Sequence, residues 1–315
     1  MKRIPIWMKR IPIWIDTDPG VDDAAAILVA HRSPALQIVG ISTLAGNAPL
    51  GVTTHNALAL CAFLGADYPV YRGAAQPWLR PYLCGADFHG ADGMGGYRLP
   101  EPTYEAEKLP MWDALRAAAE ASEEPLTVVT LGPLTNLATA FAKYPDLPQK
   151  LDRVVMMGGA AVGGNRTPCA EYNIFADPDA ALAVFRSGAR LVMCGLDVTN
   201  GAWLTGDELE AIGRQGRLGS LLCESSRSIL QKNLETGHPG WCIHDTVPVW
   251  YLLHPEWFTA REAGVYVETR SELTRGKTVT DLFSDKKFPE KNATVVLSID
   301  RERFTDAMRE IFAAD

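Results

Sequence analysis

The chain has 315 residues, of which 47% are hydrophobic and 22% charged, and its formal net charge is −8 at pH 7. These proportions are typical of a globular protein and exclude disordered and fibrous classes, and no run approaches the roughly 18 uninterrupted apolar residues of a membrane span. A negative net charge without a basic stripe argues against nucleic acid as a partner.

The N-terminus repeats one heptapeptide, MKRIPIW, at residues 1–7 and again at 8–14. Lys9 and Arg10 interrupt the apolar run that a secretory signal needs. We therefore interpret residues 1–7 as a duplicated start. Residues 8–315 are expected to form one domain, since no linker or composition shift divides them.

The six cysteines are widely spaced and form no C-x-x-C pair. This spacing predicts free thiols rather than a zinc site or a redox pair. A reducing cytoplasm is the expected location.

Short β-branched runs alternate with helical patterns along the chain. Strands are expected at residues 11–16, 36–43, 126–131, 153–158 and 189–197, and helices at 22–33 and 49–64. Apolar runs without alternation predict strands that are covered on both faces, hence a single α/β domain with a largely parallel, mixed central sheet and a Rossmann-like core. The stretch 73–110, rich in Gly and Pro, is expected as a functional surface loop.

Four carboxylates crowd the end of the first predicted strand, at Asp16, Asp18, Asp22 and Asp23. The carboxyl ends of parallel strands form the crevice in which such sheets bind ligands. Carboxylates so close repel one another, and a set of oxygen ligands points to Ca²⁺ or Mg²⁺. The alternative is a solvated acidic loop that begins a helix.

Several strings resemble one known family in an order that covers nearly the whole chain from Met8. They are D-T-D-P-G-V-D-D-A (16–24), T-L-A-G-N (43–47), H-G-A-D-G (89–93), L-G-P-L-T-N (131–136), M-G-G-A (157–160), A-E-Y-N-I-F-A-D-P (170–178) and H-D (244–245). By these strings the chain resembles the inosine-uridine-preferring nucleoside hydrolases, which cleave the N-glycosidic bond of ribonucleosides.

The resemblance implies a Ca²⁺ site made by Asp18, Asp23, Asp245 and the backbone carbonyl of Leu131. Asp18 would also be the general base that activates a Ca²⁺-bound water, and the ribosyl group would pass through an oxocarbenium-like transition state. Without the resemblance, Asp245 reads as a cap of the helix that starts at Thr246.

The resemblance also assigns residues that bind the ribose. These are Asp22, Asn47, Glu171 and Asn173, with Asn165 on the 5′ side of the sugar. By themselves, Asn47 and Asn165 read as ordinary turn residues. Asp16 would orient its neighbours, whereas Asp177 and Asp179 are interpreted as residues that start a helix.

On the side of the base, His244 would protonate the leaving nitrogen. His89 would cover the base. Trp241 and Tyr82 are candidates to stack on it, with packing in an apolar lid as the alternative.

Two other functions remain open on the residues alone: a phosphatase of the haloacid dehalogenase type, which also has D-x-D after a first strand, and a non-enzymatic calcium or sugar-binding module. Base preference is expected to depend on loops 73–110 and 215–243, with pyrimidine nucleosides slightly favoured by the resemblance. The family also implies a homodimer or homotetramer.

Overall fold

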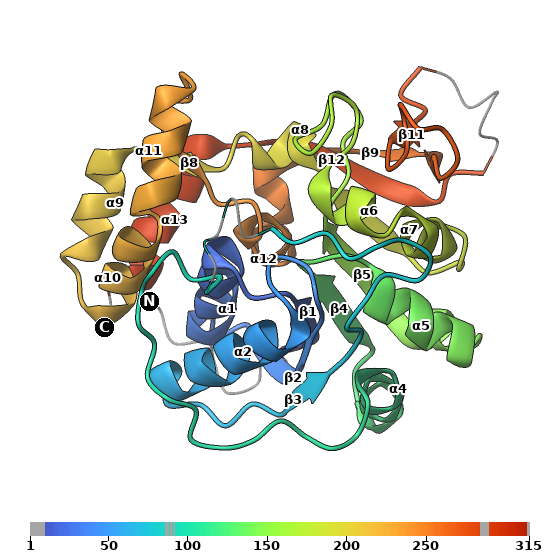
Figure 1. Ribbon diagram of the computed structural model, residues 1–315, viewed down its shortest axis with the longest axis horizontal. Helices are drawn as coiled ribbons and strands as arrows, with labels where there is room; N and C mark the ends of the chain where they lie inside the picture. The colour runs from blue at the N-terminus through green and yellow to red at the C-terminus, as the bar shows by residue number, and fades with distance from the viewer. Residues whose placement is uncertain (1–9, 86–87, 89, 91, 284–289, 314–315) are drawn as a thin grey trace.

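An eight-stranded sheet runs through the computed structural model, which describes residues 10–85, 88, 90, 92–283 and 290–313 (Figure 1). In spatial order its strands are β3 (Val70–Arg72), β2 (Leu36–Thr43), β1 (Ile11–Thr17), β4 (Leu126–Thr130), β5 (Leu151–Met157), β6 (Leu191–Cys194), β12 (Ala293–Ile299) and β9 (Phe258–Ala263). Neighbours pair in parallel except β12 and β9, which are antiparallel. The predicted single-domain α/β fold with a largely parallel, mixed sheet is confirmed, whereas residues 1–7 lie outside the described part.

The strand order places a crevice beside β1. The chain runs outward from β1 to β2 and β3, then returns to form β4 on the other side of β1. Loops after β1 and β4 therefore leave the sheet in opposite directions, which opens a crevice at their carboxyl ends.

Helices cover both faces of the sheet. On one face lie α1 (Val21–Arg32), α2 (Leu50–Leu64) and α12 (Thr246–Leu253), and on the other lie α4 (Met111–Ala121), α5 (Thr135–Lys143) and α7 (Pro178–Phe185). Alternate side chains of β1 enter the two cores, because successive residues of a strand point to opposite faces. Ile13 and Ile15 pack with the first group of helices, and Trp14 packs with the second.

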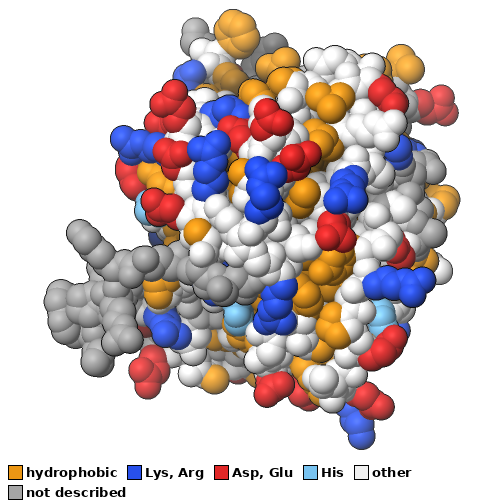
Figure 2. Space-filling model, turned by 90° about the vertical axis from the view of Figure 1, so that its left-hand side faces the viewer, with side chains coloured by type: hydrophobic (Ala, Val, Ile, Leu, Met, Phe, Trp, Pro, Cys, Tyr) orange, Lys and Arg blue, Asp and Glu red, His pale blue; other side chains and the backbone are white. Residues whose placement is uncertain are grey.

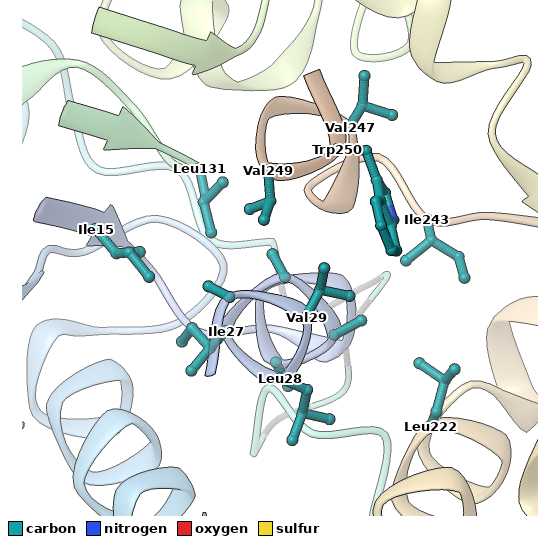
Figure 3. Packing of buried hydrophobic residues seen from close by; sticks show 14 of the residues in the cluster. Ile15, Ile27, Leu28, Val29, Leu131, Leu222, Ile243, Val247, Val249 and Trp250 are labelled. Atoms are coloured by element: carbon teal, nitrogen blue, oxygen red, sulfur yellow. The ribbon is translucent and has the colours of Figure 1, made fainter. Parts of the chain in front are cut away.

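Helix α1 is buried on all sides, from Val21 to Ala30. Figure 3 shows it end-on, with Ile15 and Leu131 toward the sheet and Val247, Val249 and Trp250 of α12 beside it. After its acidic first turn the helix is apolar on every side from Ala24 to Ala30 and needs such a surrounding, and the packing fixes its N-terminal turn at the crevice.

Four helices form the left-hand side of the molecule in Figure 1, namely α9 (Gly206–Gly213), α10 (Arg217–Ser225), α11 (Arg227–Glu235) and α13 (Arg301–Phe312). Figure 2 shows that acidic and basic side chains are interspersed on this side. Glu208 of α9, for example, pairs with Arg301 at 2.8 Å and with Arg309 at 3.5 Å.

Shorter elements complete the fold. They are α6 (Tyr172–Ala176), α8 (Leu196–Thr199), the 3-10 turns Leu147–Lys150 and Pro255–Trp257, the ribbon of β7 (Trp203–Leu204) with β8 (Trp241–Cys242), and the hairpin of β10 (Val265–Val267) with β11 (Thr278–Thr280). All six cysteines are free, as expected. In the described residues we find no helix with the length and apolar character needed to cross a membrane.

Candidate active site

The turn between β1 and α1 buries the carboxylate of Asp18 completely. Its Oδ2 accepts a hydrogen bond from the backbone N–H of Asn47 at 2.6 Å, and its Oδ1 has no hydrogen-bond partner among the described residues. A Cβ at Gly46 would lie 1.9 Å from Oδ2, and a Cβ at Gly132 would lie 2.3 Å from Oδ1. Glycine at both positions lets the loops after β2 and β4 close on this carboxylate.

Asp23 belongs both to the helix start and to the acidic cluster. Its Oδ2 accepts from the N–H of Gly20 at 2.8 Å and from Asn47 Nδ2 at 3.1 Å, and its Oδ1 accepts from Thr17 Oγ1 at 2.5 Å. The predicted helix-start role is therefore present, but the side chain is fully buried rather than solvated.

Three buried carboxylates converge where α1 and α12 begin. Oxygen atoms of Asp22, Asp23 and Asp245 lie within 4.8 Å of one another. Ligand oxygens on one Ca²⁺ lie at most about 5 Å apart, because each is about 2.3–2.6 Å from the ion. This group therefore fits a hard cation, and Asp22 is a member although the resemblance assigned it to ribose.

Asp245 is the residue before α12, but its side chain makes no capping hydrogen bond. Asp245 thus occupies the N-cap position, as the alternative interpretation expected, but its side chain does not cap the helix. Its carboxylate instead joins the acidic cluster.

The cluster resists full ionisation without a cation. Burial, followed by the charge of Asp23, raises the pKa of Asp22 to about 8, and the same two causes raise the pKa of Asp18. Burial and then the charge of Asp22 raise the pKa of Asp245. A bound divalent cation would offset this repulsion.

Asp16 lies behind the cluster and does not line the cavity. Its Oδ1 accepts from Ser42 Oγ at 2.5 Å and from Asn136 Nδ2 at 2.7 Å. Burial outweighs these hydrogen bonds and raises the pKa of Asp16 to about 7. These contacts fit the predicted role of an acid that orders its neighbours.

A cavity of about 280 Å³ opens beside the acidic cluster. Predicted site residues that line it are Asp22, Asn47, Leu131, Asn165, Glu171, Asn173, His244 and Asp245. They come from segments that follow β1, β2, β4, β5 and β8, so the fold brings together most of the residues that the motifs singled out.

Glu171 and Asn173 begin the short helix α6 and form one wall. Glu171 accepts hydrogen bonds from the backbone N–H groups of Gly159 at 2.9 Å, Asn173 at 2.9 Å and Ile174 at 3.2 Å, although burial still raises the pKa of Glu171 to about 7. Asn173 Nδ2 donates to the carbonyl of Leu131 at 2.7 Å. A carbonyl oxygen has two lone pairs, so this bond leaves Leu131 able to accept once more.

Asn165 and His244 line the cavity from two different loops, which follow β5 and β8. The Oδ1 of Asn165 accepts from the N–H of Tyr172 at 2.9 Å, which joins its loop to α6. The Nδ1 of His244 lies 2.8 Å from Thr199 Oγ1, a fully buried hydroxyl in α8 that orients the imidazole ring.

The candidates for stacking on a base are placed differently from the prediction. Trp241 in β8 has no exposed surface, packs in the hydrophobic core and is absent from the cavity lining. Its role as a stacking residue is therefore corrected to core packing. Tyr82 donates to the carbonyl of Gly46 at 3.1 Å and is also outside the lining, while His89 lies outside the described residues.

The two remaining acids behave as predicted. Asp177 caps α7, with its side chain accepting from the N–H of Ala180 at 3.2 Å. Asp179 lies in the first turn of the same helix and pairs with Arg80 at 3.0 Å.

Six lining residues were not singled out from the sequence, namely Cys84, Gly85, Phe88, Met157, Arg166 and Tyr172. Met157 and Tyr172 belong to the strings at 157–160 and 170–178, and Arg166 follows Asn165, so these positions in the sequence were a usable signal. Cys84, Gly85 and Phe88 belong to the irregular stretch 73–110, where no periodicity indicates which side chains face inward.

Comparisons with known proteins agree with this architecture. The sequence profile described as inosine-uridine preferring nucleoside hydrolase matches residues 13–306. The non-specific ribonucleoside hydrolase RihC of Salmonella enteritidis PT4 is 42% identical over 299 residues, which cover 95% of this chain and 96% of that protein.

Two solved structures superpose closely on the chain. The plant nucleoside hydrolase PpNRh1 has a TM-score of 0.90 and 31% identity, and the match covers 97% of this chain and 99% of that one. The purine-preferring ribonucleoside hydrolase from Gardnerella vaginalis has a TM-score of 0.90 and 30% identity, with 96% and 98% covered. These matches set aside the phosphatase and the binding module: the protein is a ribonucleoside hydrolase, and the chain belongs to the inosine-uridine preferring nucleoside hydrolase family.

Proposed function

We propose that this hydrolase cleaves the N-glycosidic bond of its nucleoside in the 280 Å³ cavity, with Ca²⁺ held by Asp18, Asp23, Asp245 and the carbonyl of Leu131. The observation that carries the proposal is the convergence of the buried carboxylates of Asp22, Asp23 and Asp245 beside this cavity, next to the turn that holds the buried Asp18. All the donors are oxygen atoms, which are the ligands that Ca²⁺ prefers. Asp22 lies close enough to contact the ion or the ribose hydroxyls beside it.

Asp18 acts as the general base. When bound, Ca²⁺ would lower the pKa of a water molecule in the site. Asp18 Oδ2 is fixed by the N–H of Asn47, and Oδ1 is buried without a hydrogen-bond partner among the described residues. Oδ1 is therefore the atom that accepts the proton as the water attacks the anomeric carbon.

The remaining residues hold the ribose and stabilise its charge. Asp22, Asn47, Glu171 and Asn173 bind its hydroxyls, and Asn165 contacts the 5′ side. The support is their common position in the cavity lining and the hydrogen bonds that fix Glu171 and Asn173. Carboxylates around the sugar favour a transition state in which the ring carries positive charge.

His244 donates a proton to the leaving base. It lines the cavity and is oriented by Thr199. An imidazole in this position is a residue type that serves as a general acid.

The base preference is tested by ribose release from uridine, cytidine, inosine and adenosine, with added Ca²⁺ and with a chelator. We expect release from several nucleosides, with pyrimidines slightly favoured, and loss of activity on chelation that added Ca²⁺ restores. The relative RihC is named non-specific, which fits a broad range, whereas a structural neighbour is named purine-preferring. Full activity after extensive chelation would contradict the Ca²⁺ proposal.

We also propose that the chain forms a homodimer or homotetramer. The support is the family resemblance. Light scattering of the purified protein measures this directly, and a mass near the 34.3 kDa of a single chain would contradict it.

A further inference from the structure

The loop after β5, residues 158–166, forms one wall of the cavity. Asn165 and Arg166 at its end line the cavity, as does Met157 just before it. This loop contains four glycines before Asn165, at 158, 159, 163 and 164, so its own backbone gives it little stiffness. Its shape must be imposed by the contacts that surround it.

Three side chains from distant segments bind its backbone. Thr278 Oγ1 in β11 accepts from the N–H of Ala160 and donates to the carbonyl of the same residue, both at 2.8 Å. Lys277 Nζ donates to the carbonyls of Ala160 and Ala161, both at 2.9 Å.

The third side chain is Asp197 in α8. Its Oδ2 accepts from the N–H of Ala161 at 2.7 Å, and its Oδ1 accepts from the N–H of Val162 at 3.0 Å. Side chains thus satisfy the N–H and carbonyl of both Ala160 and Ala161.

Strand β11 packs closely against the loop. Thr278 is 1% exposed, and a Cβ at Gly159 would lie 2.9 Å from Thr278 Cγ2. Gly159 has a φ of +81°, a conformation that other residues rarely adopt. On the other side of the hairpin, a Cβ at Gly276 would lie 2.8 Å from the Cα of Phe175 in α6.

Residues 160–162, whose backbone is bound by Thr278, Lys277 and Asp197, are connected to the residues proposed to hold the ribose. The N–H of Gly159, next to Ala160, donates to Glu171 Oε2 at 2.9 Å. At the far end of the loop, Asn165 accepts from the N–H of Tyr172. A shift of the Ala160 backbone would therefore move both the carboxylate of Glu171 and the amide of Asn165.

We infer that Thr278 and Lys277, which do not line the cavity, are positioning residues that set the geometry of the ribose-binding wall. The inference rests on the proposed function of Glu171 and Asn165. The carboxylates of the proposed Ca²⁺ site belong to the turn before α1 and to the starts of α1 and α12, so we expect the hairpin to change sugar binding more than ion binding. A loosened wall weakens ribose binding, which raises KM more than it lowers kcat.

The test compares Thr278→Val, Thr278→Ser and the control Thr280→Val. Valine keeps the shape and strand preference but removes both hydrogen bonds to Ala160, whereas serine keeps the hydroxyl. Thr280 lies in the same strand, and among the described residues its hydroxyl bonds only to the carbonyl of Thr278, at 3.2 Å. We measure kcat, KM, inhibition by free ribose and Ca²⁺ affinity by calorimetry.

For Thr278→Val we expect KM and the ribose inhibition constant to rise by about tenfold, a factor typical of a lost pair of buried hydrogen bonds. Ca²⁺ affinity should stay within about twofold, and Thr278→Ser and Thr280→Val should stay within about threefold of the wild type in KM. Unchanged KM and ribose inhibition in Thr278→Val, or an equal effect of Thr280→Val, would overturn the inference.

Lys277→Met provides a second test that does not alter the buried threonine. It removes the two hydrogen bonds of the ammonium group, and circular dichroism checks the fold of each variant. If Thr278→Val does not fold, an unchanged KM of Lys277→Met overturns the inference, and a raised KM with unchanged Ca²⁺ affinity supports it. Absence of ribose release or ribose inhibition in the wild type would instead refute the proposed function.

Discussion

The replacement Asp18→Asn separates proton transfer from shape at the centre of the site. Asparagine has the size of aspartate, and the space is limited by Gly46 and Gly132, where added Cβ atoms would overlap the carboxylate. Its oxygen must face the N–H of Asn47, which now donates to Asp18 Oδ2 at 2.6 Å. The amide NH₂ then takes the position of Oδ1 and cannot accept a proton.

The magnitude follows from this geometry. The opposite orientation of the asparagine amide would place its NH₂ group against the N–H of Asn47, so that two donors face each other. This costs about 1–3 kcal/mol, so the opposite orientation is disfavoured. Loss of a general base lowers kcat by roughly 10²- to 10⁴-fold, which corresponds to about 2.7–5.4 kcal/mol in the activation free energy. Loss of one charge from the proposed Ca²⁺ site acts in the same direction.

Single-turnover ribose release at saturating Ca²⁺ measures this effect, after circular dichroism has shown that the variant folds. Asp177→Asn is the matched control, since Asp177 is equally buried but accepts hydrogen bonds from Trp78, Thr135 and Ala180 outside the cavity. We expect the control to lose stability and keep kcat within about threefold. If Asp18→Asn retained more than about a tenth of kcat, its assignment as general base would be refuted.

Three further predictions concern pH, the core and the N-terminus. Burial raises the pKa of Glu171 from 4.5 to about 7, so between these values the folded state binds more protons than the unfolded state and stability falls as pH rises. The free energy of unfolding of Glu171→Gln, measured by denaturation across this window, should therefore fall less steeply with pH than that of the wild type. Equal slopes would contradict this prediction. Trp241→Ala should lower the free energy of unfolding by about 3–5 kcal/mol by leaving a core cavity, with KM for nucleosides within about threefold, whereas a large KM increase without loss of stability would restore Trp241 as a base contact. Deletion of residues 1–7 should leave melting temperature and activity unchanged, because residues 8–14 repeat the same heptapeptide; a marked fall in melting temperature would show that the first copy contributes to the fold.

The sequence by itself determined five of the eight strands of the sheet, namely β1, β2, β4, β5 and β6. The strand expected at 189–197 is shorter in the structure, because β6 covers only Leu191–Cys194 and α8 begins at Leu196. The apolar run at 36–43 coincides with β2, and that at 126–131 differs from β4 by one residue. Such runs depend on burial and on neighbours in the chain, which a single sequence displays. Because motif residues follow these strands, their meeting at one edge of a parallel sheet was also predictable.

Tertiary structure alone decided which way individual side chains point and which distant segments meet. Trp241 begins β8, and a strand of two residues is too short for any period to show that the ring of Trp241 enters the core. The bond from Asn136 to Asp16 spans 120 residues, and those from Thr278 to Ala160 span 118. Local pattern encodes secondary structure because neighbouring residues share one backbone geometry, whereas these contacts depend on the packing of whole elements, which no short window of sequence contains.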